Sequence, residues 1–140
     1  MARVDFYVLG QPGRDARLRF ACRLAEKAWR LENTVHIVAS DDAAAREVDE
    51  LLWTFRDGSF VPHERLGHGE PESPVTIGTP DVDQPGRDLL INLSDDLPRA
   101  IDAFPRIAEL VTSDDETRSA GRRRFTEYRN QGHELETHQV

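Results

Sequence analysis

The feature that most constrains this 140-residue chain is an alternation of short apolar runs with longer amphipathic ones. Residues 4–9 form a β-rich run, and residues 18–29 then carry apolar side chains at the spacing of one helical face. Residues 34–39 and 44–55 repeat this order. Because parallel strands need crossover helices, the alternation predicts an α/β fold: a single-domain, Rossmann-like, mainly parallel sheet with helices on both faces.

Later segments are less uniform. Residues 75–79 and 89–93 have the pattern of further strands, whereas residues 104–111 fit a short helix or a strand equally well. Glycine, proline and acidic residues between positions 67 and 86 predict a surface loop interrupted by one strand. Ser40 is the expected N-cap of the second helix.

Length and charge narrow the class of protein. One domain covering residues 1–140 is expected, since the chain can bury a core without disulfides. The formal net charge of -8 argues against strong direct nucleic-acid binding through phosphates, although local patches could still matter. A single cysteine, Cys22, and the lack of an apolar signal or membrane-spanning run predict a cytoplasmic protein with no membrane partner.

Enzymatic interpretations find little support in the motifs. The turn at residues 10–13 lies where a phosphate loop would be, but it lacks the three-glycine fingerprint and the Gly-Lys-Ser/Thr sequence. Paired carboxylates occur at Asp41 with Asp42, Asp81 with Asp83, Asp95 with Asp96, and Asp114 with Asp115. The histidines His36, His63, His68, His133 and His138 have no metal-binding spacing. We therefore expect no catalytic residue, metal or cofactor, and a nucleotide-binding or metal-dependent enzyme is the alternative.

The last expected helix has an unusual charge. Residues 113–116 match a capping box, and the helix should run to about residue 131, with Gly132 ending it. Arg118, Arg122, Phe125 and Arg129 recur on one face. Residues 118–132 contain five arginines and one acid, a local charge of +4. Such a stripe suits an acidic peptide with an apolar anchor, and a helix whose arginines only extend into water is the alternative.

A second unusual segment, residues 49–63, contains three of the chain's few aromatic side chains around a polar turn. Leu51, Leu52 and Phe55 account for the buried face of the second helix, and Trp53 falls off that stripe. An off-stripe tryptophan beside a glycine-containing turn is typical of an interface anchor.

Several ungapped motifs occur in order along nearly the whole chain. They are Phe6-Tyr7-Val8-Leu9, Ala28-Trp29-Arg30, Leu52-Trp53 followed by Ser59-Phe60-Val61-Pro62-His63, Asp88-Leu89-Leu90-Ile91-Asn92-Leu93, and Arg124-Phe125-x-x-Tyr128-Arg129-x-x-Gly132. In these motifs the chain resembles the chi subunit family of bacterial DNA polymerase III. The resemblance implies a non-catalytic accessory subunit of the clamp-loader complex. Such a subunit bridges the psi subunit to the acidic C-terminal tail of single-stranded DNA-binding protein, which ends in phenylalanine, during DNA replication.

The resemblance also assigns partner contacts by position. For the tail these are Val111, Arg118, Arg122, Phe125, Tyr128, Arg129 and Gly132; for the psi subunit they are Trp53, Phe60 and Pro62. Thr126 departs from the family, in which a basic residue is often found. Gly121 is costly inside a helix, and the sequence leaves open whether it admits a partner or another element of the fold.

Overall fold

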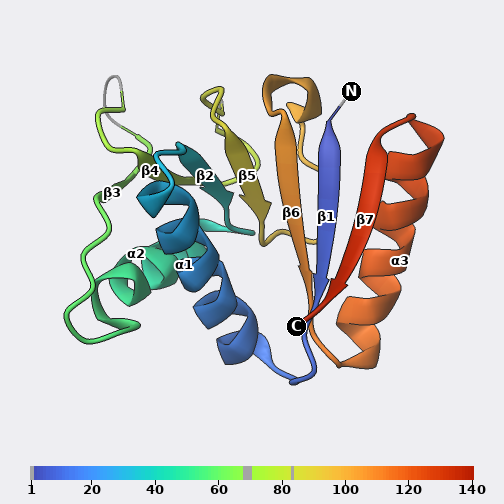
Figure 1. Ribbon diagram of the computed structural model, residues 1–140, viewed down its shortest axis with the longest axis horizontal. Helices are drawn as coiled ribbons and strands as arrows, with labels where there is room; N and C mark the ends of the chain where they lie inside the picture. The colour runs from blue at the N-terminus through green and yellow to red at the C-terminus, as the bar shows by residue number, and fades with distance from the viewer. Residues whose placement is uncertain (1, 68–70, 83) are drawn as a thin grey trace.

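The computed structural model describes residues 2–67, 71–82 and 84–140 (Figure 1). In chain order the elements are β1 (Arg3–Val8), α1 (Arg14–Arg30), β2 (Val35–Val38), α2 (Asp42–Thr54), β3 (His63–Arg65), β4 (Val75–Gly78), β5 (Leu89–Asn92), the 3₁₀ turn η1 (Ile101–Ala103), β6 (Arg106–Val111), α3 (Asp115–Asn130) and β7 (Glu134–Gln139). His68 and Asp83 lie outside the described residues.

The strands form one seven-stranded sheet in the order β3-β4-β2-β5-β6-β1-β7, and every strand pair is parallel. The predicted α/β fold with a parallel sheet is confirmed. The two termini lie at opposite ends of the sheet, because the first strand β1 and the C-terminal edge strand β7 are parallel neighbours (Figure 1).

Helices cover both faces of the sheet, so the core has two parts. On one face α1 and α2 pack on the sheet around Ile37, Val48 and Leu52. On the other face α3 and η1 enclose a cluster that includes Phe104 and Tyr128. Successive residues of a strand point to opposite faces, so β1 and β6 supply side chains to both clusters.

Two predicted helix starts are wrong in detail. Asp41, rather than Ser40, is the N-cap of α2, and its carboxylate accepts a hydrogen bond from the Ala44 N–H at 2.8 Å. No capping box forms at Ser113, because the N-cap is Asp114 and its carboxylate accepts a bond from the Gly13 N–H at 2.9 Å instead. That contact ties the start of α3 to the loop before α1.

Residues 106–111 are a strand, which decides the alternative that the sequence left open. The loop between residues 67 and 86 does contain one strand, β4, as predicted. The short strand β3 and the edge strand β7 were not predicted. Leu135 is the only apolar residue of β7, and it is partly buried. The alternation of apolar and polar residues that marks a strand is therefore weak in this segment. Within the described ranges, no helix has the length and apolar character needed to cross a membrane.

Candidate protein-binding surfaces

A groove of about 580 Å³ runs between α3 and the sheet. Its lining residues come from β1, β6, α3 and β7, and are Phe6, Val8, Val111, Arg118, Gly121, Arg122, Phe125, Thr126, Thr137 and Gln139. We call this the α3 groove. Its floor is apolar, and the Phe125 ring packs against Phe6 with centroids 5.3 Å apart. Arg118 and Arg122 are exposed at its rim, so the groove offers an apolar slot beside two cations.

Gly121 sets how closely α3 approaches the sheet. A Cβ atom added at this position would lie 2.9 Å from Cγ2 of Val111 on β6, which is too close for a real contact. The lack of a side chain at Gly121 therefore allows β6 to pack closely against α3. This decides between the two alternatives that the sequence left open, a partner or another element of the fold. Because α3 lies so near β6, Val111 forms the groove floor between the arginines and Phe6.

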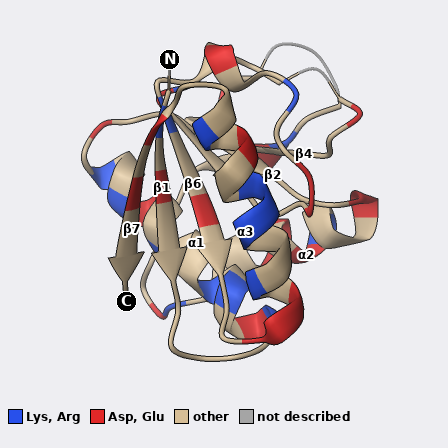
Figure 2. Ribbon diagram, turned by 90° about the vertical axis from the view of Figure 1, so that its right-hand side faces the viewer, with Lys and Arg blue, Asp and Glu red and all other residues tan. Residues whose placement is uncertain are grey.

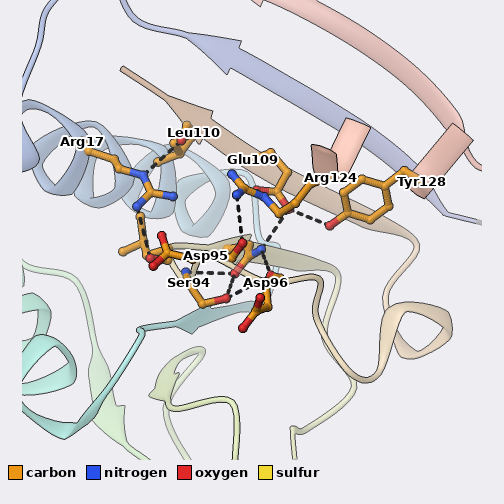
Figure 3. Close-up of polar contacts among 10 residues, drawn as sticks. Arg17, Ser94, Asp95, Asp96, Glu109, Leu110, Arg124 and Tyr128 are labelled. Carbon is orange, nitrogen blue, oxygen red and sulfur yellow. Dashed lines mark hydrogen bonds and ion pairs between the residues drawn. The ribbon is translucent and has the colours of Figure 1, made fainter. Parts of the chain in front are cut away.

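A buried polar network holds α3 in place beneath the groove (Figure 3). Glu109 on β6 accepts hydrogen bonds from Arg124 Nε at 3.0 Å and from the Tyr128 hydroxyl at 2.7 Å. Asn92 on β5 donates to the same carboxylate at 2.9 Å, and Arg124 also donates to the Asp95 carbonyl. Burial raises the pKa of the Tyr128 hydroxyl, and Glu109 raises it further, so this group stays neutral and donates. The network fixes the rotation of α3 and hence which of its side chains face the groove.

The structure separates the seven residues assigned to tail contact. Val111, Arg118, Arg122 and Phe125 line the groove together. The Tyr128 side chain, on the inner face of α3, is fully buried, and its hydroxyl donates a hydrogen bond to Glu109.

The other two residues, Arg129 and Gly132, are exposed at the end of α3 and are not part of the groove lining. Gly132 has a φ of +85°, which terminates the helix as predicted.

Charge is distributed unevenly along α3. Figure 2 shows basic residues along the body of the helix, while two of its three acidic residues, Asp115 and Glu116, lie in the first turn. Within the described part of the chain, Arg118 and Arg122 make no ion pair, whereas Arg124 is paired with Glu109. Two of the helix's guanidinium groups are therefore free to bind an anion that enters the groove.

A second candidate surface lies at the far end of the sheet, beyond α2. Trp53 is 53% exposed and Phe60 is 58% exposed, and their ring centroids are 5.6 Å apart. Pro62, two residues after Phe60 in the sequence, is half-buried. We call these three residues the aromatic patch. The prediction that Trp53 lies off the buried face of α2 is confirmed, since Leu52 is buried there.

The aromatic patch rests on buried polar contacts. The His63 ring lies 4.6 Å from that of Trp53 and is held by the carbonyl oxygens of Val61 and Asp49, at 2.6 and 3.0 Å. The polar turn before Phe60 is fixed to α1, because Arg56 and Ser59 both donate hydrogen bonds to the buried carboxylate of Glu26. These contacts present two large rings to solvent from a fixed backbone, as interface anchors require.

The turn at residues 10–13 is poorly suited to phosphate. The Gly13 N–H, which would face a phosphate there, donates to the Asp114 carboxylate. That hydrogen bond lowers the pKa of Asp114, so the carboxylate is negative at neutral pH. Arg14 is paired with Glu47 at 2.8 Å. A phosphate in this position would have to displace an anion that already occupies it.

Among the described residues, the paired carboxylates do not converge on one site. Asp41 caps α2 and Asp114 caps α3, while Asp95 and Asp96 contribute backbone carbonyls to the buried network. Among the described residues, one group of three side chains could reach a common ion, and it contains none of these pairs. Burial raises the pKa of Cys22 to about 12, so this thiol is not a nucleophile.

Sequence reasoning missed part of the α3 groove. Phe6 and Val8 were predicted only as strand residues, and Thr137 and Gln139 belong to the unpredicted strand β7. The period-2 pattern of residues 4–9 could have shown that Phe6 and Val8 share a face. No signal in the sequence alone indicates that β7 pairs beside β1.

Comparison with known proteins agrees with this architecture and these motifs. The protein-family model described as DNA polymerase III chi subunit, HolC, matches residues 1–136. DNA polymerase III subunit chi of Pseudomonas aeruginosa is 44% identical, covering 100% of this chain and 98% of that protein. The chi subunit of Haemophilus influenzae is 34% identical, covering 97% and 96%. That of Escherichia coli is 32% identical, covering 98% of this chain and 97% of that protein.

Among solved structures, the crystal structure of T4 UvsW is similar with a TM-score of 0.73 and 8% identity, covering 99% of this chain and 41% of that one. At such low identity this similarity concerns the fold alone, and it defines the class as a parallel α/β domain. The chain belongs to the DNA polymerase III chi subunit family. Its family thus places it among the accessory subunits of a polymerase that acts in DNA replication.

Proposed function

We propose that this protein bridges the psi subunit of the clamp-loader complex to the acidic C-terminal tail of single-stranded DNA-binding protein. In this role it is a single-domain cytoplasmic adaptor without catalytic activity. The tail binds the α3 groove and the psi subunit binds the aromatic patch. The observation that carries the proposal is the α3 groove itself, which combines an apolar slot with two arginines that have no ion-pair partner among the described residues.

The chemistry of the groove matches a tail that is acidic and ends in phenylalanine. A terminal phenylalanine ring fits among Phe6, Val111 and Phe125, where it is removed from water. Arg118 and Arg122 then pair with the terminal carboxylate and the acidic side chains that precede it. Thr126 also lines the groove and is uncharged, so the positive charge of the rim comes from Arg118 and Arg122.

The aromatic patch is proposed as the psi contact because it exposes two adjoining rings on a rigid turn. Tryptophan and phenylalanine that pack into a partner's pocket commonly dominate the binding energy of an interface. The patch belongs to residues 53–62, and the groove belongs to the other edge of the sheet. The two partners therefore contact different surfaces.

A peptide titration tests the tail site. A short acidic peptide that ends in phenylalanine should bind the full chain, and Arg122→Ala should weaken binding at least about tenfold, which is about 1.4 kcal/mol. Arg46→Ala removes the same charge from α2 and serves as the matched control. The affinity should fall as salt is raised, because exposed ion pairs are screened within about 8 Å at physiological ionic strength. A peptide that binds equally well without its phenylalanine, or a flat salt response, would contradict the proposed site.

A further inference from the structure

A shallow hollow of about 470 Å³ lies on the outer side of α3, next to the α3 groove. It is lined by Arg122, Arg123, Thr126 and Glu127, and we call it the outer hollow. Arg122 and Thr126 also line the α3 groove, so the two hollows meet at these side chains. A peptide that leaves the groove can therefore continue over α3, because the side chain at the crossing, Thr126, is small and uncharged.

The residues of the outer hollow follow one another in a fixed order around α3. Each residue turns a helix by about 100°, so Arg123 lies about 100° beyond Arg122, and Thr126 lies between these two arginines. Glu127 lies further round, beyond Arg123. A chain that comes from the groove thus meets Thr126 first, then Arg123 and only then Glu127. Arg123 is the first charged side chain of the outer hollow that it reaches beyond the groove rim.

Arg123 is available to bind an anion. It is exposed, and within the described ranges it makes no ion pair, although Glu127 is one helical turn away, where a pair could form. Its neighbour Arg124 differs, because that side chain is buried and paired with Glu109. The Arg123 guanidinium therefore keeps its hydrogen-bond donors for a partner.

The acids of α3 do not cancel the positive charge of this surface. Past its first turn, the helix exposes one acid, Glu127, against four arginines, Arg118, Arg122, Arg123 and Arg129. Asp115 and Glu116 lie in the first turn, at least seven residues before Arg123, which is about 10 Å along the helix axis. The outer side of α3 therefore attracts acidic groups that approach from the groove.

The acids of the neighbouring strand β7 face the other way. Thr137 and Gln139 line the α3 groove, and successive residues of a strand point to opposite faces. Glu134 and Glu136 therefore point to the other side of the sheet, where Glu136 is paired with Arg3. An acidic peptide on the outer side of α3 is not opposed by these two carboxylates.

We propose that the outer hollow binds the acidic side chains that precede the apolar end of the tail, with Arg123 as the contact that selects for them. The terminal phenylalanine stays in the α3 groove, and the chain crosses α3 at Thr126. An extended chain spans about 3.4 Å per residue, and a helix with its side chains is about 10–12 Å wide, so acids about three or more residues before the end reach Arg123. This inference rests on the proposed function and adds a residue that distinguishes acidic tails from neutral ones.

The two hollows together favour a peptide over a nucleic acid. A phosphodiester strand could also pair with Arg123, but it has no apolar end group for the groove floor formed by Val111 and Phe125. The net charge of -8 also opposes the approach of a long polyanion. A short acidic peptide with an apolar end fits both hollows at once.

Two synthetic peptides of equal length that end in phenylalanine test this inference by fluorescence anisotropy with the full chain. One carries aspartates before its apolar end, and the other carries asparagines there. Arg123→Glu should weaken the aspartate peptide about tenfold, because it replaces an attraction by a repulsion, and should change the asparagine peptide by no more than about twofold. Arg46→Glu, at an exposed position of α2, is the charge-matched control and should leave both affinities within about twofold.

Arg122→Ala separates failure of this inference from failure of the proposed function. Arg122 lines both hollows, so its loss should weaken both peptides. If it does so while Arg123→Glu acts equally on both peptides, or no more than Arg46→Glu does, the tail site stands and the outer hollow is excluded. No binding of either peptide would overturn the proposed function and this inference with it. Binding of an oligothymidylate that Arg123→Glu weakens more than it weakens the aspartate peptide would assign the outer hollow to nucleic acid instead.

Discussion

The α3 groove takes its lining from four elements far apart in the sequence, whereas the aromatic patch takes all its residues from positions 53–62. The groove therefore depends on long-range packing: β7 must pair with β1, and α3 must lie close to β6. The patch depends on one helix end, one turn and the contacts of that turn with Glu26. A change in the core beneath α3 should thus alter the groove and leave the patch intact.

The strongest separation of the two surfaces is expected from Glu109→Ala. The variant leaves the buried guanidinium of Arg124 without its carboxylate, which costs about 3–5 kcal/mol of unfolding free energy. Urea denaturation measures the loss, and Glu127→Ala, exposed on the same helix, is the control with a change within about 0.5 kcal/mol. A loss for Glu109→Ala as small as that of the control would show that the network does not hold α3.

Acid should destabilise the fold, because the core on the groove side of the sheet contains the buried His36, which stacks on Phe104. Burial lowers the pKa of His36 from 6.5 to about 4, so the folded protein keeps this ring neutral. Between these values the unfolded chain binds more protons, and stability falls as the pH decreases. The expected loss from pH 7 to pH 5 is about 2 kcal/mol. Urea denaturation of His36→Gln at both pH values should lack this component, and an unchanged pH dependence would contradict the assignment.

Gly121→Ala tests the close approach of α3 to β6. The added methyl meets Val111, and overpacking of about 1–3 kcal/mol is partly offset by alanine's helix propensity, leaving a net loss of about 1 kcal/mol. Tail-peptide affinity should fall as well, because the helix must move outward. Ser119→Ala is the control on an exposed position of α3. Val111→Ala makes room for the methyl, so Gly121→Ala should cost less unfolding free energy in the Val111→Ala background than in the unchanged chain, and an equal cost in both backgrounds would count against this explanation.

The smallest effect on stability is expected at the aromatic patch. Trp53 is more than half exposed, so Trp53→Ala should change the unfolding free energy by no more than about 0.5 kcal/mol. Its effect on a partner should be much larger, because an anchoring tryptophan commonly contributes at least about 2 kcal/mol to binding. Calorimetric titration with the psi subunit measures the second quantity. Unchanged psi affinity in a folded Trp53→Ala protein would remove the patch from the interface.

The sequence predicted most of what is local. Periodicity located α1, α2, the parallel strands β1, β2, β4 and β5, and the exposure of Trp53, because these depend on side chains within one segment. It also placed Arg118, Arg122 and Phe125 on one helical face, and they do line the groove together.

The sequence did not predict the tertiary contacts. The Asp114 carboxylate accepts a hydrogen bond from the Gly13 N–H and none from the first turn of α3, so the predicted capping box does not form. Tyr128 is one turn from Phe125, yet it is bonded to Glu109 and fully buried, which helical spacing alone does not distinguish from exposure. The strand β7 has a single, partly buried apolar residue, Leu135, and is held in the sheet by its pairing with β1.

The independence of the two surfaces can be measured directly by titrating the tail peptide into the preformed complex of this protein with the psi subunit. If the α3 groove and the aromatic patch hold different partners, the complex should bind the peptide with the affinity of the free chain, within about twofold or about 0.4 kcal/mol. Release of the psi subunit on peptide addition, or a loss of affinity beyond about tenfold, would contradict a bridging role.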